Sequence, residues 1–413
     1  MVTSRERVMA AVDHREPDRV PVDFGGHRSS GIMAIAYNKL KQYLGITSGD
    51  IYVYDFVQQL AVVEPPVLER FGVDTLELGR GFAHDPSDWR DWVLPDGTPC
   101  KIPAFIEPVR VGGDWHVYDQ DGTLIAIQKA GSLYFEQTCF PLEHDAGEDF
   151  ANLEDAMTKV LWSALGSPPA PIGFDPEGLR QHAAGAKALR ATTDRAILGL
   201  FGGNLMEWGQ FIFRMETFLL QLAMEPRRMH RFLDRLTEIH LEALEKFLAA
   251  VGPYVDIILF GDDLGMQTGP QVSPSMYREF FLPRHRLLWE TAKKLADVKV
   301  MLHSCGSVAA YIPAFIEAGL DILQPVQTSA RNMDAARLKR EFGRELCLWG
   351  GGCDTQTVLP RLAPDQVAGD VRERMGILSP GGGYVFQQVH NIMANVPPQN
   401  IVAMFDAVNA PQG

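Results

Sequence analysis

The stretch KVMLHSCG, residues 299–306, decides the fold class that this sequence predicts. It opens on a short apolar run, which is typical of a strand buried on both faces of a parallel sheet. The run ends on His303, and Cys305 follows where the chain is expected to turn. A strand here would therefore deliver an imidazole and a thiol together to its carboxyl end.

Seven other apolar runs have the same character, and helical patterns separate most of them. The eight runs are residues 20–25, 75–79, 196–202, 256–261, 299–303, 321–326, 346–350 and 384–388. Eight strands that alternate with helices predict an α/β fold of the (β/α)8 TIM-barrel type, with a doubly wound sheet as the alternative.

The helical patterns carry their own start signals. The clearest covers residues 226–250, where apolar residues recur at 3.6-residue spacing after Pro226. Further helices are expected from Ser273-Pro274, from Met333 to Phe342, and near Pro364 and Pro398.

Residues 90–160 interrupt the alternation. Their stretches LPDGT (94–98) and YDQDGTL (118–124) place Asp-Gly turn signals between apolar residues, which predicts β-hairpins. We interpret this segment as an insertion that helps to roof the site of a single barrel domain, residues 1–413. A plain barrel needs about 250 residues, so a chain of 413 also has room for extra N-terminal helices.

Charge and composition exclude several classes of protein. Lys and Arg number 38 against 52 Asp and Glu, a formal net charge of -14. This balance argues against a partner nucleic acid or an anionic membrane surface, which both need a basic face. No run offers the ~20 apolar residues of a membrane span, and the N-terminus has no apolar signal region. We therefore expect a cytoplasmic protein whose five cysteines are reduced.

Two cysteines stand where a metal ligand would be useful. Zinc prefers the mixture of nitrogen and sulfur that His303 and Cys305 offer, although H-x-C alone is a weak signal and a buried structural cysteine is the alternative. In WGGGCDTQ (349–356), Cys353 would emerge at the same rim two strands later. We predict that these three residues bind zinc, with His390 or an aspartate available to complete a tetrahedron.

The remaining candidates also come from the ends of predicted strands. Adjacent side chains on a strand face opposite ways, so at most one of Asp262 and Asp263 should point into the site. These two aspartates and His390 are the predicted catalytic residues. The predicted substrate-binding residues are Arg28, Asn204 and Gln327.

Several motifs together carry a resemblance to a known family. The stretches are residues 5–26, 261–270, 303–307, 319–327, 338–343, 349–360 and 389–401. With them the chain resembles the uroporphyrinogen decarboxylase superfamily over nearly its whole length, which implies a (β/α)8 barrel. The cofactor-free decarboxylases of that superfamily use an arginine-rich first-strand segment and an early aspartate. Here Arg28 is the only arginine in residues 23–31, and LGRG (78–81) has no acid in register with the early aspartate.

The chain looks more similar to the other branch, the zinc-dependent methyltransferases of corrinoid pathways. In that branch H-x-C and a later cysteine hold zinc, which matches His303 and Cys305, with either Cys353 as third ligand or His390 as its substitute. The resemblance implies methyl transfer between a small methylated substrate, with a methoxy group or a thiol, and a cobalamin-carrying corrinoid protein or a thiol acceptor. Cobalamin-dependent O-demethylation is one version, and the sequence leaves a homodimer open.

Three other functions stay open at this stage. The first is a cofactor-free decarboxylase of the uroporphyrinogen type, which metal analysis would separate from a zinc enzyme. The second is a non-catalytic protein that binds a tetrapyrrole or corrinoid. The third is a barrel whose zinc is purely structural.

Overall fold

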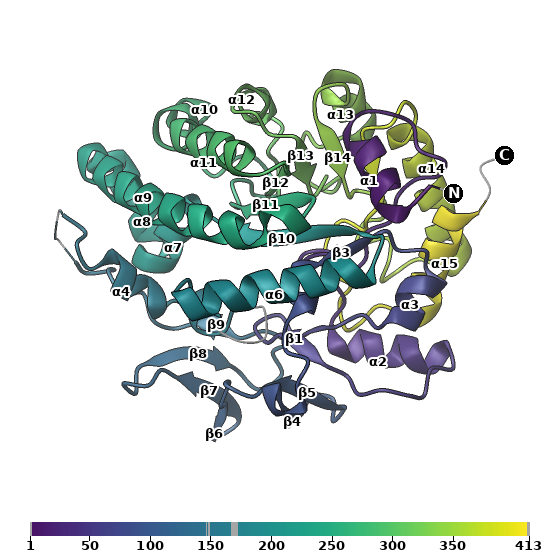
Figure 1. Cartoon of the computed structure of the whole chain (residues 1–413), viewed down its shortest axis with the longest axis horizontal. Helices are drawn as coiled ribbons and strands as arrows, with labels where there is room; N and C mark the ends of the chain where they lie inside the picture. The colour runs from purple at the N-terminus through teal and green to yellow at the C-terminus, as the bar shows by residue number, and fades with distance from the viewer. Residues whose placement is uncertain (1, 146, 148, 167–171, 411–413) are drawn as a thin grey trace.

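The computed structural model describes residues 2–145, 147, 149–166 and 172–410. Seven parallel strands form one curled sheet in the order β15-β14-β13-β12-β11-β10-β3 (Figure 1). Their bounds are β3 (Thr75–Glu77), β10 (Ala196–Gly202), β11 (Ile257–Gly261), β12 (Lys299–His303), β13 (Ile322–Gln324), β14 (Cys347–Trp349) and β15 (Tyr384–Val385). Each strand lies within one of the predicted apolar runs.

The eighth run closes the sheet into a barrel through a single bridge. Val22 pairs in parallel with Phe386, just after β15. The Val22 carbonyl also accepts a hydrogen bond of 2.8 Å from the backbone N–H of Asp74, just before β3. Because Val22 joins both edge strands, the predicted TIM-barrel-like fold is confirmed and the doubly wound alternative is wrong.

Helices between the strands cover the outside of the barrel (Figure 1). They are α6 (Pro176–Thr192), α7 (Met206–Phe213), α8 (Met215–Met224), α9 (Pro226–Val251), α10 (Pro274–Met276), α11 (Leu282–Leu295), α12 (Ile312–Glu317), α13 (Ala335–Phe342), α14 (Pro364–Leu378) and α15 (Pro398–Asn409). The helix expected from Met333 begins two residues later, because the Asp334 carboxylate accepts the backbone N–H of Arg337 and caps it.

The chain also builds elements outside the barrel. N-terminal helices are α1 (Ser4–Val12), α2 (Ala34–Tyr43) and α3 (Pro65–Arg70), and β1 (Val53–Asp55) pairs with β2 (Leu60–Ala61). Two antiparallel sheets lie together at the bottom of Figure 1. They consist of β4 (Trp89–Val93), β5 (Pro99–Pro103), β6 (Val109–Val111), β7 (Asp114–Tyr118), β8 (Leu124–Gln128) and β9 (Glu136–Gln137).

These antiparallel strands confirm the predicted hairpins. Residues 94–98 connect β4 to β5, and residues 118–124 form the turn between β7 and β8. The short helices α4 (Leu153–Thr158) and α5 (Leu161–Ala164) follow. Positions 146 and 148 of the predicted insertion lie outside the described residues, and the single-domain boundary of 1–413 stays a prediction.

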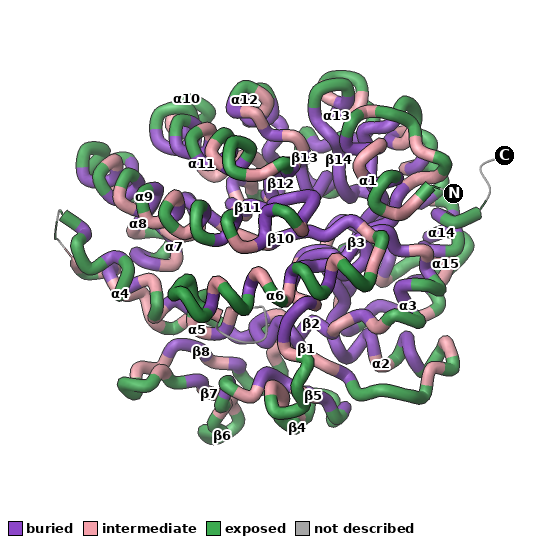
Figure 2. The backbone as a smooth tube through the Cα atoms, viewed as in Figure 1, coloured by how far each residue is buried: buried purple, intermediate pink, exposed green. Residues whose placement is uncertain are grey.

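The barrel interior is filled by alternate side chains of its strands. Figure 2 shows buried backbone along the strands and exposed surface on the outer helices. Leu259 of β11 and Met301 of β12 belong to the inner cluster, which Val8 and Ala11 of α1 also join. Side chains at the alternate positions of the same strands, such as Leu302 of β12, point outward and belong to the larger hydrophobic cluster with the helices. Among the described residues, no helix has the length and apolar character that would let it cross a bilayer.

Candidate metal centre

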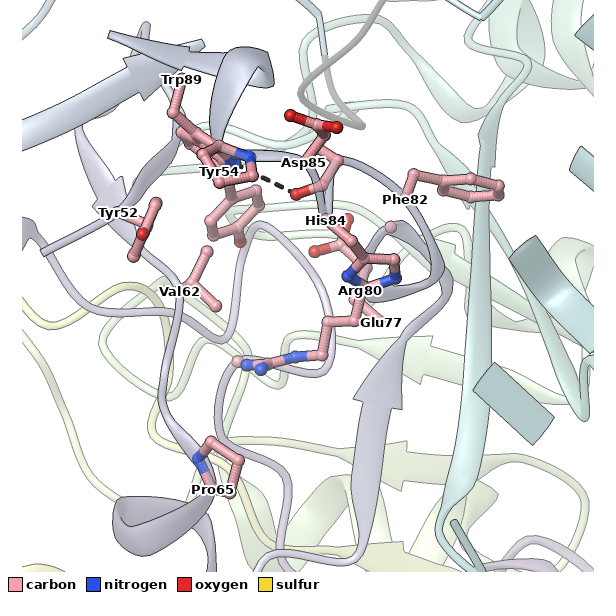
Figure 3. Close-up of a pocket in the computed structure, with 14 residues that line it drawn as sticks. Tyr52, Tyr54, Val62, Pro65, Glu77, Arg80, Phe82, His84, Asp85 and Trp89 are labelled. Atoms are coloured by element: carbon pink, nitrogen blue, oxygen red, sulfur yellow. Dashed lines mark hydrogen bonds between the residues drawn. The ribbon is translucent and has the colours of Figure 1, made fainter. Parts of the chain in front are cut away.

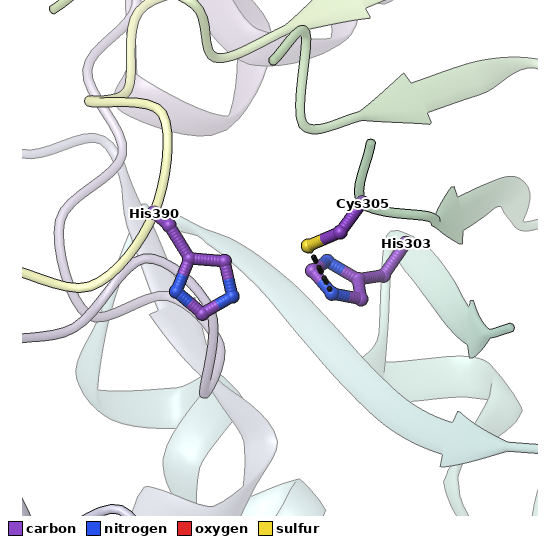
Figure 4. A group of neighbouring side chains, drawn as sticks. All are labelled: His303, Cys305 and His390. Atoms are coloured by element: carbon purple, nitrogen blue, oxygen red, sulfur yellow. Dashed lines mark hydrogen bonds between the residues drawn. The ribbon is translucent and has the colours of Figure 1, made fainter. Parts of the chain in front are cut away.

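His303, Cys305 and His390 come together at the carboxyl ends of the strands (Figure 4). Their ligand atoms all lie within 4.8 Å of one another. The Cys305 Sγ is 3.5 Å from the His303 Nε2, and the two imidazole rings are 5.7 Å apart at 61°. Two nitrogens and one sulfur therefore face a common point from two segments far apart in the sequence.

Strand alternation explains why His303 reaches this point. Met301 faces the barrel interior, and side chains two residues apart on a strand share a face. His303, the last residue of β12, therefore points to the same side, where the strand opens into the barrel mouth. Burial lowers the pKa of His303, so its ring stays neutral and its Nε2 lone pair stays available.

A chain of amide side chains fixes the tautomer of His303. Its Nδ1 lies 2.5 Å from the Gln324 Oε1, and an amide oxygen can only accept, so the proton sits on Nδ1. Gln324 in turn donates to the Gln387 Oε1 at 3.0 Å, and Gln387 donates to the Ser29 carbonyl at 3.0 Å. Each amide orientation is thus set by the next partner, and Nε2 is left as the ligand atom.

The backbone of Cys305 is fixed by neighbouring residues. Its N–H donates to the Asp263 Oδ1 at 2.7 Å. The next residue, Gly306, has φ +85° and packs on the backbone of Gly265, where an added Cβ would collide with a carbonyl carbon. Burial, followed by the charge of Asp263, raises the pKa of the Cys305 thiol, so a nearby cation is needed to hold the thiolate form.

The segment after β15 places His390. Gln388 donates to the Ser30 carbonyl at 3.0 Å, and Asn391 donates to the Arg28 carbonyl at 2.9 Å. The N–H of Val389 donates to the Cys353 carbonyl at 2.9 Å. Burial and the neighbouring His303 lower the pKa of His390 to about 4, which keeps this ring neutral as well. Its predicted acid–base role stays a prediction.

Cys353 does not join this group, which corrects the ligand set preferred from the sequence. Its side chain is fully buried in the apolar core, and its Sγ lies 3.9 Å from the Asp354 carbonyl. The strand before Cys353 ends where the sequence predicts. The turn of residues 350–352 then directs the Cys353 thiol into the apolar core between the helices and the sheet. His390, the alternative left open by the sequence, takes the third position.

The donor set fits a zinc ion. Zn–S and Zn–N bonds of about 2.3 and 2.0 Å at a tetrahedral angle separate the two donors by about 3.5 Å. This matches the 3.5 Å between Cys305 and His303, and the His390 ligand atom lies within 4.8 Å of both. Three protein ligands leave a fourth position, which is the arrangement of a catalytic zinc rather than a structural one.

The two aspartates after β11 separate as strand alternation requires. Asp263 lies 3.5 Å from the His303 Nε2 and accepts the Cys305 N–H. Asp262 is fully buried on the other side, where it accepts the N–H groups of Met206 and Glu207 at 3.0 Å each. Asp262 therefore caps α7, and its predicted catalytic role stays a prediction.

The predicted substrate-binding residues occupy different environments. The Gln327 Oε1 accepts the Gly306 N–H at 2.7 Å, so this side chain holds the loop after Cys305. Asn204 donates to the Glu207 Oε2 at 2.5 Å at the start of α7. The Arg28 guanidinium lies 3.6 Å from the Asp55 carboxylate and 5.3 Å from the Trp162 ring. Substrate contact by Arg28, Asn204 and Gln327 stays a prediction.

Glu207 is a candidate that the sequence reasoning missed. It accepts the N–H of Asp263 at 3.1 Å as well as the Asn204 amide. Burial, followed by the charges of Asp263 and Asp262, raises its pKa to about 8. A carboxyl group that keeps its proton near neutral pH can act as an acid. The available signal was an acid three residues after Asn204 at the start of a helix that follows a strand.

The fold and the site define an α/β barrel with a candidate metal centre at the carboxyl ends of its strands. Residues 179–411 match the family described as uroporphyrinogen decarboxylase (URO-D), and the chain belongs to that family. The superfamily expected from the motifs is thereby confirmed.

The relatives that match the chain include a methyltransferase and two decarboxylases. Methylated-thiol–coenzyme M methyltransferase from Methanosarcina mazei is 29% identical over 149 residues, which is 36% of this chain and only 36% of that protein. Uroporphyrinogen decarboxylase from Serratia proteamaculans is 25% identical over 326 residues, 71% of this chain and 87% of that protein. The Psychromonas ingrahamii decarboxylase is 23% identical over 320 residues, 70% and 86% of the two chains.

A solved structure supports the fold over the full length. A methyltransferase from Methanosarcina mazei superposes with a TM-score of 0.58, covers 99% of both chains and is 16% identical to this chain. At this identity the match shows the fold alone.

Proposed function

We propose that this protein is a zinc-dependent methyltransferase. It would move a methyl group between a small methylated substrate, with a methoxy group or a thiol, and a corrinoid protein or a thiol acceptor. The observation that carries the proposal is the group of His303, Cys305 and His390, whose donor atoms converge at the barrel mouth. The names of the two Methanosarcina mazei proteins support the reaction class.

His303, Cys305 and His390 would hold the zinc. When bound, a zinc ion with a sulfur ligand is a Lewis acid that favours soft groups such as a substrate thiol. The chain's own residues do the positioning. Gln324 holds the His303 ring in one tautomer, and Asp263 fixes the backbone of Cys305. Glu207, which keeps a proton near neutral pH, would supply it to an oxygen from which a methyl group departs.

Metal content tests this proposal directly. We expect about one zinc per chain in the wild-type protein, and loss of that zinc in Cys305→Ala and in His390→Ala. Cys353→Ala is the matched control, because its thiol lies in the core outside the group. Wild-type protein that binds no zinc after reconstitution would refute the proposal, and so would zinc loss in Cys353→Ala alone.

Activity then tests the reaction class. Zinc-loaded protein should methylate reduced cobalamin from at least one compound in a panel of methoxylated aromatics and methylated thiols. His303→Ala should abolish that transfer. Cobalamin carried by a partner protein stays part of the proposal, as does the cytoplasmic location.

Cofactor-free decarboxylation is the second candidate, because the decarboxylase matches cover about 70% of the chain. The sequence weakens it at one point. Residues 78–81, where the resemblance places the early aspartate of the decarboxylases, contain no acid. Turnover of uroporphyrinogen by metal-free protein would favour this candidate over methyl transfer.

A further inference from the structure

A cavity of about 420 Å³ lies between the end of β3 and the β4–β5 hairpin (Figure 3). None of the three metal-centre residues lines it. Its wall carries aromatic rings, including Tyr52 and Trp89, which meet edge to face at 4.8 Å. The volume falls within the range of small-molecule sites, roughly 300–1,000 Å³.

The wall of this cavity also carries a cation that acts on the neighbouring Glu77 carboxyl through its charge but makes no hydrogen bond to the described residues. Arg80, in the short helical turn η1 (Leu78–Gly81), lines the cavity, and Figure 3 shows its guanidinium extended along it. Within the described part of the chain, no hydrogen bond or ion pair involves that guanidinium. Burial lowers the pKa of Arg80, which reflects the cost of keeping this charge out of water.

A second polar group beside the cavity is also unsatisfied. Tyr54 lines the cavity, is 7% exposed, and its hydroxyl has no hydrogen-bond partner among the described residues. A buried hydroxyl normally has a hydrogen-bond partner, and leaving it without one is destabilising. Two donors that share one cavity and lack acceptors point to an acceptor that is supplied from outside.

The acidic residues on the wall limit what that acceptor can be. Glu77 and Asp85 also line the cavity, so a doubly charged phosphate would meet two carboxyl groups. A carboxylate carries a single charge and matches the two parallel donors of a guanidinium. The aromatic rings favour a flat apolar body attached to it.

We propose that this cavity binds a small aromatic carboxylate. The Arg80 guanidinium pairs with the carboxylate, the Tyr54 hydroxyl donates to it, and the ring lies against Tyr52 and Trp89. Gly25 lines the cavity wall. It belongs to the segment 23–31, whose backbone carbonyls accept hydrogen bonds from the neighbours of His390, Gln388 and Asn391. The cavity is nevertheless separate from the metal centre, and the proposal does not rest on the proposed function.

Benzoate is the probe, titrated against the full zinc-reconstituted chain by ligand-observed NMR. We expect saturable binding that weakens at least tenfold in Arg80→Met and about threefold in Tyr54→Phe, as expected for lost hydrogen bonds to a charged group. Benzamide, which has the same shape without the charge, should bind at least about tenfold more weakly. The Arg372→Met control removes the same charge from an exposed site on α14 and should leave binding unchanged.

Three results would overturn the proposal. One is the absence of saturable benzoate binding to the wild-type protein. Another is equal benzoate affinity in Arg80→Met and wild type; if Arg80→Met does not fold, equal affinity in Arg80→Lys and wild type would overturn it in the same way. The third is loss of binding in Cys305→Ala, which would place the carboxylate at the metal centre instead.

Discussion

His303 owes its chemistry to a neighbour on the next strand. Gln324 is its register partner on β13, and the Gln324 Oε1 accepts a hydrogen bond of 2.5 Å from the His303 Nδ1–H. Without that acceptor the ring would exchange between tautomers and lose part of its preference for presenting Nε2. Partners of this kind tune metal affinity without touching the metal.

Gln324→Leu should therefore weaken zinc binding by about 10- to 100-fold, because it removes the acceptor and leaves the imidazole N–H unpaired. Competition with a chelator of known affinity measures the change. Gln324→Glu keeps an acceptor in the same place and should retain tight binding. Equal zinc affinity in Gln324→Leu and wild type would show that the amide does not set the tautomer.

Glu207 should make stability depend on pH. Its pKa is near 4.5 in the unfolded chain and about 8 in the folded one, so the folded state holds the proton more tightly. The stability it contributes is full below about pH 4.5 and is lost as the pH rises through about 8. Relative to wild type, Glu207→Gln should gain free energy of unfolding between pH 5 and 8.

Denaturant titrations of chelator-treated protein at several pH values measure this difference. Glu242→Gln, on the exposed face of α9, is the control for removing one carboxylate. A constant difference between Glu207→Gln and wild type across this range would contradict the account.

At the scale of elements, the start of α7 depends on Asp262. Its carboxylate accepts two backbone N–H groups of the first turn and lies 3.1 Å from the His285 Nε2. Asp262→Ala should lower the free energy of unfolding by roughly 2 kcal/mol or more, because it removes the cap and leaves buried N–H donors without an acceptor. Zinc stoichiometry should not change. Loss of zinc with full stability would place Asp262 in the site instead.

The elements themselves were largely predictable from the sequence, whereas the ligand set was not. A buried parallel strand leaves a local signature, so every strand of the main sheet lies inside a predicted run. Alternation along β11 separated Asp262 from Asp263 in advance. The direction of the Cys353 thiol depends on a glycine turn and on packing against distant helices, and no local pattern records either. Gln324 and Glu207 act through contacts across strands, which sequence spacing does not show.

At the scale of the whole molecule, Asp74 ties the closing segment to the barrel. This fully buried carboxylate pairs with Arg7 of α1 and Arg19 at 2.7 Å each, and it accepts the Val22 N–H at 2.9 Å. Removing it leaves two arginines without their buried partner at the one place where the sheet closes by a single bridge.

Asp74→Ala should therefore cost about 3–5 kcal/mol, the usual cost of breaking a buried ion pair. Arg70→Ala breaks an exposed pair with Asp406 and should cost less than about 1 kcal/mol. Unfolding by denaturant compares the two variants. Similar small losses in both would mean that Asp74 does not hold the barrel closed.

X-ray absorption at the zinc edge tests the central claim most directly, because it counts the sulfur and nitrogen neighbours of the bound ion. The ligand set of His303, Cys305 and His390 predicts one sulfur near 2.3 Å and two imidazole nitrogens near 2.0 Å. The Cys353→Ala spectrum should be identical to that of wild type. Two sulfur neighbours, with one lost in Cys353→Ala, would contradict the account.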